Sequence, residues 1–343
     1  MVLQEEVLAE KIMPRNKRMI KWGIIGPGNI ARKFIKEVNI EGESRIVSVY
    51  GRNEARAEKF AKENSVERYY CDLEKFLNDE EVDAVYIATP HNTHMEFAKS
   101  CINHNKHVLC EKPFSYNAGT SREVFELAEK SDVFVMEALK PLFMPAVKKA
   151  KEWVDQGRIG KVKMITANFG SRNYEEESPR LYSRQSAGGA LLDVGIYPIM
   201  FANYMMSAVP ESIKATAEMT STGVDETDVI SLKYANGQLA SLTCSIICSN
   251  GKDAVIYGER GKIVVPSFSK AKEVYLYSDD GEEKYTDSYE GYGMKYEIHE
   301  ANKCIIEKKL QSKTATHKMT LDTARVMDEV RKQIGLKYPF EEQ

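Results

Sequence analysis

The first predicted element of the chain is a short apolar strand at residues 21–25 that runs directly into a glycine-rich turn. The turn reads G-x-G-x-x-A over residues 26–31 and opens an amphipathic helical segment. Gly26 permits the tight turn, Gly28 lets the backbone approach a pyrophosphate, and the small Ala31 lets the helix pack close to the strand. Free N–H groups in the first turn of that helix face the anion. The predicted nucleotide-binding residues at this turn are Gly26, Gly28, Asn29 and Ile30.

Strands and helices alternate through the first part of the chain. Strict alternation implies right-handed crossovers and a doubly wound parallel sheet of the Rossmann type. The further strands are expected at 45–50, 84–88, 107–110 and 133–136, and the helices at 54–64, 73–77, 93–103 and 117–130.

The second part of the chain favours longer strands with period-two patterning, separated by turn signals. It predicts an α+β domain with a large, open, mainly antiparallel sheet. Strands are expected at 162–170, 211–220, 229–234, 238–247, 253–258, 261–265 and 273–278, and helices at 189–207, 292–307 and 321–334. Because helices would cover one face of this sheet, the other face predicts a homodimer or homotetramer.

These patterns divide the chain into three segments. Residues 1–18 are expected to form an N-terminal extension, residues 19–138 a dinucleotide-binding domain, and residues 139–343 a substrate-binding and oligomerisation domain. The last helix, 321–334, is a candidate to pack back on the first domain.

Composition excludes several classes of function. The chain has 343 residues, is 43% hydrophobic and carries a formal net charge of −3, without a block of like charges that would favour nucleic acid or an anionic membrane. Its mean hydropathy is −0.43, and no apolar run approaches the roughly 20 residues that span a bilayer. The six cysteines lack paired spacing, and residues 1–18 lack the apolar core of a signal peptide. We therefore expect a cytoplasmic protein with reduced cysteines.

Three further segments follow the glycine turn in order: A-T-P-H-N-T-H at 88–94, C-E-K-P at 110–113, and G-G-A-L-L-D-V-G-I-Y-P at 188–198. Together the four segments resemble the glucose-fructose oxidoreductase, inositol dehydrogenase and rhizopine-catabolism oxidoreductase (Gfo/Idh/MocA) family. They are most similar to the branch that holds dimeric dihydrodiol dehydrogenase and NADP-linked xylose dehydrogenase. The resemblance implies an NAD(P)-dependent dehydrogenase that acts on a CH–OH group of a sugar, polyol or diol.

Three residues are the catalytic candidates. Lys112 follows a strand at the carboxyl edge of the sheet, where ligands of such sheets bind, and the resemblance implies a cis bond before Pro113. Asp193 and Tyr197 are four residues apart and share a helical face. An ammonium about 4 Å from a phenol favours phenolate by roughly 4 kcal/mol at an effective dielectric of 20, although burial opposes this. We therefore expect Tyr197 to transfer the proton, Lys112 to act on the substrate oxygen, and Asp193 to orient substrate or tyrosine.

Each candidate has a structural alternative: a solvated lysine, a carboxylate that complements a helix dipole, and an interface aromatic. The division of acid and base roles between Lys112 and Tyr197 stays open from sequence.

The second strand indicates which nicotinamide cofactor binds. An NAD site usually carries Asp or Glu directly after this strand, whereas here Arg52 follows it and no carboxylate comes before Glu54. Arginine can accept a 2′-phosphate and stack on adenine, so the sequence predicts NADP, with NAD possible. His91 and His94 have no suitably spaced carboxylate or cysteine, so no metal is expected. Position and resemblance add Asn53, Thr89, Pro90, Asn92, His94 and Glu111 as cofactor-binding residues.

The substrate pocket departs from the related branch. Residues 137–143 read E-A-L-K-P-L-F instead of E-A-x-W-x-R-F, so Lys140 replaces an aromatic side chain and Leu142 an arginine. A lysine suits a polyhydroxylated or acidic substrate. The expected substrate-binding residues are Lys140, Phe169, Arg172 and Tyr292. Two other functions stay open, namely a redox-cycling glycosidase with tightly held NAD and a non-catalytic protein that senses NAD(P).

Overall fold

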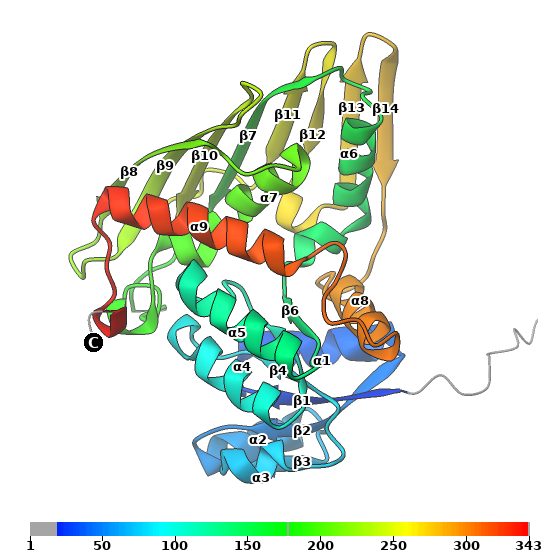
Figure 1. The fold of residues 1–343 in the computed structure, drawn as a ribbon, viewed down its shortest axis with the longest axis vertical. Coiled ribbons are helices and arrows are strands. Elements are labelled where there is room, and N and C mark those ends of the chain that lie inside the picture. The colour runs from blue at the N-terminus through cyan, green and yellow to red at the C-terminus, as the bar shows by residue number, and fades with distance from the viewer. Residues whose placement is uncertain (1–18, 177, 342–343) are drawn as a thin grey trace, which may run out of the picture.

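The computed structural model describes residues 19–176 and 178–341 and contains two sheets (Figure 1). The first sheet is parallel throughout and has the order β3-β2-β1-β4-β5-β6, which confirms the doubly wound Rossmann prediction. Its strands are β1 (Ile20–Ile25), β2 (Ser44–Tyr50), β3 (Arg68–Tyr70), β4 (Ala84–Ile87), β5 (His107–Cys110) and β6 (Val135–Glu137). Its helices are α1 (Asn29–Glu41), α2 (Glu54–Glu63), α3 (Leu73–Leu77), α4 (His94–Asn103) and α5 (Ala118–Lys130).

Local sequence signals set the bounds of these helices. Asn53 and Asn117 cap α2 and α5 through side-chain oxygens that accept the N–H groups of Arg56 and Thr120. Helix α1 ends at Gly42, which adopts the left-handed conformation typical of a helix C-terminus. Because β1 pairs parallel with both β2 and β4, the carboxyl ends of these strands lie at one edge of the sheet.

The second sheet has the order β14-β13-β12-β11-β7-β10-β9-β8. Its described neighbours pair antiparallel except β7 with β10, so the prediction of a mainly antiparallel sheet is confirmed. The strands are β7 (Val162–Gly170), β8 (Ser212–Met219), β9 (Asp225–Lys233), β10 (Leu239–Ser245), β11 (Ala254–Gly258), β12 (Gly261–Val265), β13 (Glu273–Ser278) and β14 (Gly281–Thr286). The helices are α6 (Pro145–Asp155), α7 (Ile196–Met206), α8 (Lys295–Ile306) and α9 (His317–Ile334). Figure 1 shows α6, α7 and α9 on one side of this sheet.

Helix α9 contacts the first sheet as well as the second. The His317 ring stacks on Phe125 of α5 at 4.0 Å between centroids, and its Nε2 lies 3.0 Å from the carbonyl oxygen of Val135. The N–H of Val135 donates to the carbonyl of Leu310 (3.1 Å). The chain between β14 and α9 therefore covers the outer edge of β6.

The structure contains three elements that the sequence analysis did not predict: β3, α6 and β14. Strand β3 has three residues, and β14 is a charged edge strand with little period-two patterning. Helix α6 begins with Pro145; proline is favourable in the first turn of a helix, although it breaks a helix at interior positions. Helix α9 begins at His317, four residues before the expected start, because the Thr316 side chain caps it by accepting the N–H of Met319.

Residues 1–18, the predicted extension, lie outside the described residues. In the described part of the chain, no helix combines the length and apolar composition needed to cross a bilayer. All six cysteines are free, and four of them are buried, whereas Cys71 and Cys248 are exposed.

Candidate active site

A cavity of about 510 Å³ lies at the carboxyl ends of β1, β2 and β4. This is the edge at which ligands of open parallel sheets bind. The glycine turn forms one wall, the segment after β2 a second, and the segment after β4 a third. The predicted cofactor-binding residues that line it are Gly26, Gly28, Arg52, Asn53, Thr89 and Pro90.

The two glycines of the turn have different surroundings. Gly26 has φ +102°, and a Cβ there would lie 2.7 Å from the carbonyl oxygen of Ala88, so the turn itself requires glycine. A Cβ on Gly28 would meet no atom within 4 Å. The space over Gly28 is therefore open for a pyrophosphate at the N-terminus of α1, where Asn29 and Ile30 form the first turn.

Arg52 and Arg56 both line the cavity beside the N-terminus of α2, and both are exposed. Arg56 is not among the predicted residues, although its place one helical turn after Arg52 was a usable signal. Asn53 caps α2, so its side-chain oxygen is already used by the N–H of Arg56 (2.9 Å). Two guanidinium groups and a helix N-terminus form a site for a phosphate group.

Five other predicted cofactor residues do not line this cavity: Asn29 and Ile30 in the first turn of α1, and Asn92, His94 and Glu111. Both ring nitrogens of His94 contact main-chain carbonyls, of Thr89 and Pro113, at 2.9 Å each. Glu111 accepts hydrogen bonds from the Tyr86 hydroxyl and from the Lys112 N–H. The Asn92 carboxamide oxygen is buried without a hydrogen-bond partner. The geometry of His94 and Glu111 therefore fits support of the loops after β4 and β5 rather than direct contact with a cofactor.

The Lys112 ammonium lies between the other two catalytic candidates. Its Nζ donates to the main-chain carbonyl of Asp193 (2.6 Å), lies 3.7 Å from the Asp193 carboxylate, and is 5.1 Å from the centre of the Tyr197 ring. The Lys112–Pro113 bond is cis, as the family resemblance implied. The structure therefore brings Lys112, Asp193 and Tyr197 together from segments that are 81 residues or more apart.

Electrostatic interactions keep Lys112 and Asp193 charged, whereas Tyr197 keeps its proton. Burial raises the pKa of Tyr197 to about 12, and the nearby Lys112 ammonium offsets this only in part. Although burial acts to lower it, Asp193 and Tyr197 raise the pKa of Lys112 above its ordinary value. The pKa of Asp193 is held low by Lys112 and Arg180 against the effect of burial. At neutral pH Tyr197 therefore keeps its proton, and the shift toward phenolate that the sequence suggested does not prevail.

A π-turn over Leu191–Gly195 precedes α7 and carries Asp193. In π geometry a carbonyl pairs with the N–H five residues later, and for Asp193 that residue is Pro198, which has no N–H. The Asp193 carbonyl accepts Lys112 instead. The π-turn is where this helical segment departs from α geometry.

Two residues that sequence analysis did not place at the site complete it. Arg180 donates from Nη2 to the Asp193 carboxylate (2.8 Å), and its Nη1 lies 3.3 Å from Nε2 of the buried His91. Burial lowers the pKa of His91 well below its usual range, and Arg180 adds to this effect. His91 therefore stays neutral and accepts from Arg180. No spacing rule links residue 180 to residue 91, so only the fold could reveal this contact.

Gly188 and Gly189, which precede the π-turn, allow neighbouring parts of the protein to pack closely against the backbone. A Cβ on Gly188 would lie 2.4 Å from the carbonyl oxygen of Leu181, and one on Gly189 would lie 2.0 Å from the carboxylate of buried Asp225. Protein atoms therefore fill the space beside both glycines. Asp225 accepts the Leu191 N–H (2.5 Å) and pairs with Asp228, whose pKa rises to about 9 through burial and the Asp225 charge.

Of the four predicted substrate residues, Phe169 lies at the site, because it stacks on Tyr197 with centroids 4.7 Å apart. The other three make different contacts. The Lys140 ammonium donates to the carbonyl of Tyr292 (3.0 Å), and the Tyr292 ring faces Lys33 of α1 at 5.0 Å. Arg172 is exposed and lies over the Tyr174 ring at 5.5 Å. No contact in the described residues joins Arg172 to the Lys112 group.

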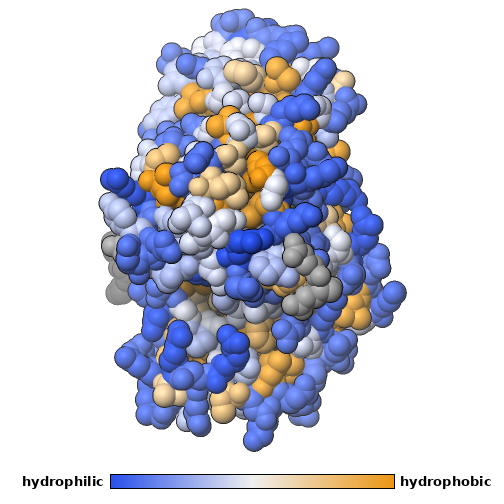
Figure 2. Space-filling view, turned by 90° about the vertical axis from the view of Figure 1, so that its left-hand side faces the viewer, coloured by the Kyte–Doolittle hydropathy of each residue, from blue (hydrophilic) through white to orange (hydrophobic). Residues whose placement is uncertain are grey.

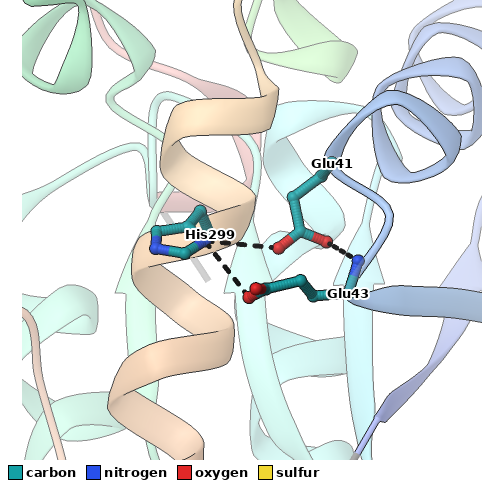
Figure 3. A group of neighbouring side chains, drawn as sticks. All are labelled: Glu41, Glu43 and His299. Atoms are coloured by element: carbon teal, nitrogen blue, oxygen red, sulfur yellow. Dashed lines mark hydrogen bonds and ion pairs between the residues drawn. The ribbon is translucent and has the colours of Figure 1, made fainter. Parts of the chain in front are cut away.

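One group of possible metal-ligating side chains occurs in the described residues (Figure 3). His299 of α8 points between Glu41 and Glu43, with its Nδ1 at 3.4 and 3.5 Å from their carboxylates. Both glutamates precede β2, so the group lies at the amino edge of the first sheet, opposite the cavity. Contacts of the His299 ring with the two carboxylates account for this arrangement.

Family models match most of the chain. Residues 20–139 match the model described as "Oxidoreductase family, NAD-binding Rossmann fold", and residues 147–264 match the GFO/IDH/MocA C-terminal domain. The chain is 32% identical to trans-1,2-dihydrobenzene-1,2-diol dehydrogenase of Danio rerio, over 94% of this chain and 99% of that protein. It is 33% identical to scyllo-inositol 2-dehydrogenase (NADP(+)) IolU of Bacillus subtilis, over 94% of this chain and all of that protein.

Solved structures share the fold. KijD10, a 3-ketoreductase from Actinomadura kijaniata in complex with NADP and TDP-benzene, superposes with a TM-score of 0.83 at 22% identity, covering 92% of this chain and 98% of that one. Levoglucosan dehydrogenase in complex with NADH and levoglucosan superposes with the same score at 19% identity, covering 94% and 100%. With the two family models matched in order, the chain belongs to the GFO/IDH/MocA family of oxidoreductases.

Proposed function

We propose that this protein is an NADP-dependent dehydrogenase that moves a hydride between nicotinamide and a CH–OH or C=O carbon of a sugar, polyol or diol. The observation that carries the proposal is the Lys112–Asp193–Tyr197 group, held at the same sheet edge as the cavity. Relatives named as dehydrogenases of a dihydrodiol and of an inositol support the substrate class.

The cavity fits a dinucleotide with a 2′-phosphate. The open space over Gly28 and the N-terminus of α1 suit the pyrophosphate, and Arg52 and Arg56 suit the 2′-phosphate. Thr89 and Pro90 would line the nicotinamide side. When bound, the cofactor supplies a ring carbon that accepts or releases the hydride.

Protein side chains transfer the proton to or from the substrate oxygen. In reduction, Tyr197 donates its phenolic proton to the carbonyl oxygen while Lys112 stabilises the negative charge that develops there. In oxidation the substrate C–H hydrogen would leave as hydride to the nicotinamide, and the O–H proton would pass to Tyr197, which accepts it only as phenolate, the form that its raised pKa makes scarce at neutral pH. Asp193, anchored by Arg180, holds the ammonium in place.

The direct test is a screen of sugars, polyols and dihydrodiols with NADP and, separately, with NAD. We expect the absorbance of reduced nicotinamide to rise with at least one compound, and the KM for NADP to be lower than that for NAD. Arg52→Ala should raise the KM for NADP about tenfold or more while it changes the KM for NAD little, because it removes a charge-assisted contact worth roughly 1.5–3 kcal/mol.

Three outcomes would contradict this proposal. Equal KM values for both cofactors would remove the role of Arg52. Sugar hydrolysis without net change in nicotinamide absorbance would favour a redox-cycling glycosidase. Cofactor binding with no turnover of any compound would favour a sensing protein.

We also propose that the cofactor-binding part ends near residue 138, because β6 ends the first sheet at Glu137 and later strands join the second sheet.

We propose that two or four copies of the chain associate through the second sheet. Met164, Val229 and Leu239 are exposed on the neighbouring strands β7, β9 and β10, and Figure 2 shows hydrophobic side chains on the upper part of one face. Light scattering at micromolar concentration should give a dimer or tetramer mass, and a monomer mass would refute the association.

We further propose a cytoplasmic location.

A further inference from the structure

Lys252 places a cation beside the catalytic group without a matching anion. Its Nζ lies 4.9 Å from the centre of the Phe169 ring, and that ring stacks on Tyr197. The side chain is partly buried, and within the described residues no carboxylate forms an ion pair with it. Burial lowers the pKa of Lys252, and the neighbouring Lys270 lowers it further, with no opposing anion. A partly desolvated ammonium of this kind gains from an anionic partner.

Lys270 extends this positive region toward the first sheet. It ends the short helical turn Phe268–Lys270, and Phe268 meets Phe169 edge-on at 6.3 Å. Lys270 is exposed, makes no ion pair within the described ranges, and is close enough to lower the pKa of both Lys252 and Lys140. Burial is the main cause of the shift at Lys140. Since Lys140 follows β6 and Lys252 lies against Phe169, Lys270 stands between the two sheets.

The carboxylates near this region are already engaged elsewhere. Glu37 accepts the main-chain N–H groups of Tyr292 and Lys295, and Glu111 accepts Tyr86. The buried Glu297 opposes the pKa shift of Lys140, but no carboxylate acts on Lys252 in this way. The uncompensated charge is therefore at Lys252 and Lys270, next to Phe169.

We propose that the substrate carries an anionic group, a carboxylate or a phosphate, that binds Lys252 and Lys270 while its reacting carbinol lies at Lys112 and Tyr197. This inference rests on the proposed function and narrows it from sugars and polyols in general to their acids or phosphate esters. The cofactor phosphates are not the partner, because the sites that suit them are the glycine turn and the Arg52–Arg56 pair of the cavity.

The test compares matched compounds with the full-length enzyme and NADP: glucose, galactose and mannose, each with its uronate and its 6-phosphate. We expect kcat/KM for at least one anionic member to exceed that of its neutral parent about tenfold or more, with the advantage reduced in 0.5 M NaCl. The better anionic series identifies the group, since a carboxylate and a phosphate differ in size and charge. Lys252→Gln and Lys270→Gln should each raise KM for that compound severalfold or more, with little change in the KM for NADP, and Lys252→Arg should retain most of the affinity.

Lys262→Gln is the matched control, because Lys262 is also a lysine over an aromatic ring, at 5.3 Å from Tyr277, but lies on β12 away from Phe169. A neutral parent that is turned over as well as or better than both anionic partners would overturn the inference and leave the proposed function intact. If no compound reduces NADP, the proposed function fails for these sugars. Calorimetric titration of the NADP complex with glucuronate and glucose 6-phosphate then decides the inference, and absence of binding by both overturns it.

Discussion

Replacement of Lys112 by methionine is expected to lower kcat by about 100-fold or more, because in the proposed mechanism it removes the cation that stabilises charge on the substrate oxygen. Methionine preserves most of the volume of the side chain and loses the contact with the Asp193 carbonyl. Asp193 keeps its ion pair with Arg180, so the fold should persist. Steady-state kinetics at saturating NADP measure the effect, and the melting temperature verifies folding.

Lys130→Met is the matched control, since Lys130 is an exposed residue in the last turn of α5 and should be close to neutral. Tyr197→Phe should give a loss of the same order if the phenol carries the proton. A Tyr197→Phe enzyme with full activity would remove tyrosine from the mechanism, and a Lys112→Met enzyme with unchanged kcat would remove the lysine.

Substitution of Gly189 by alanine is expected to destabilise the protein by about 3 kcal/mol or more. A methyl group there would lie 2.0 Å from the Asp225 carboxylate, and the backbone has φ +109°, so steric overlap adds to conformational strain. Asp225 also holds the Leu191 N–H at the start of the π-turn, so the same change displaces Asp193. Urea unfolding measures the loss of stability.

Gly237→Ala separates the two causes. Gly237 also has positive φ (+83°), but a Cβ there would meet no atom within 4 Å, so it should cost only the strain of about 1 kcal/mol. The double variant Gly189→Ala/Asp225→Ala should lose less than the sum of the single changes, because the overlap disappears. Equal losses for Gly189→Ala and Gly237→Ala would show that the contact with Asp225 is unimportant.

Much of the fold and part of the site follow from local signals. The glycine turn and the alternation of strands and helices correctly predicted a Rossmann sheet, and period-two patterning correctly predicted a second, mainly antiparallel sheet. The lysine and tyrosine motifs indicated residues that the structure brings together. Charged β14 and the proline-initiated α6 carry the wrong local pattern, so periodicity could not find them. Arg180 meets His91 and Asp193 only through the packing of distant segments, and nothing in the spacing of these residues encodes that contact.

The acid–base balance of the site also lay beyond sequence. A lysine near a tyrosine suggested a lowered phenol pKa, but the degree of burial decides the sign, and burial wins at Tyr197. The packing at the paired glycines Gly188 and Gly189 also could not be predicted from the local pattern. Their neighbours, the backbone at Leu181 and the Asp225 carboxylate, come from other parts of the chain.

Because residues near Leu310 and His317 cover β6, this strand is covered only late in translation. A ribosome completes the other strands of the first sheet long before residues 310–317 emerge, so β6 is an open sheet edge in the nascent chain. Open edges pair readily with other unfolded chains. The β6 edge of the first sheet is therefore covered only once almost the whole polypeptide has been made.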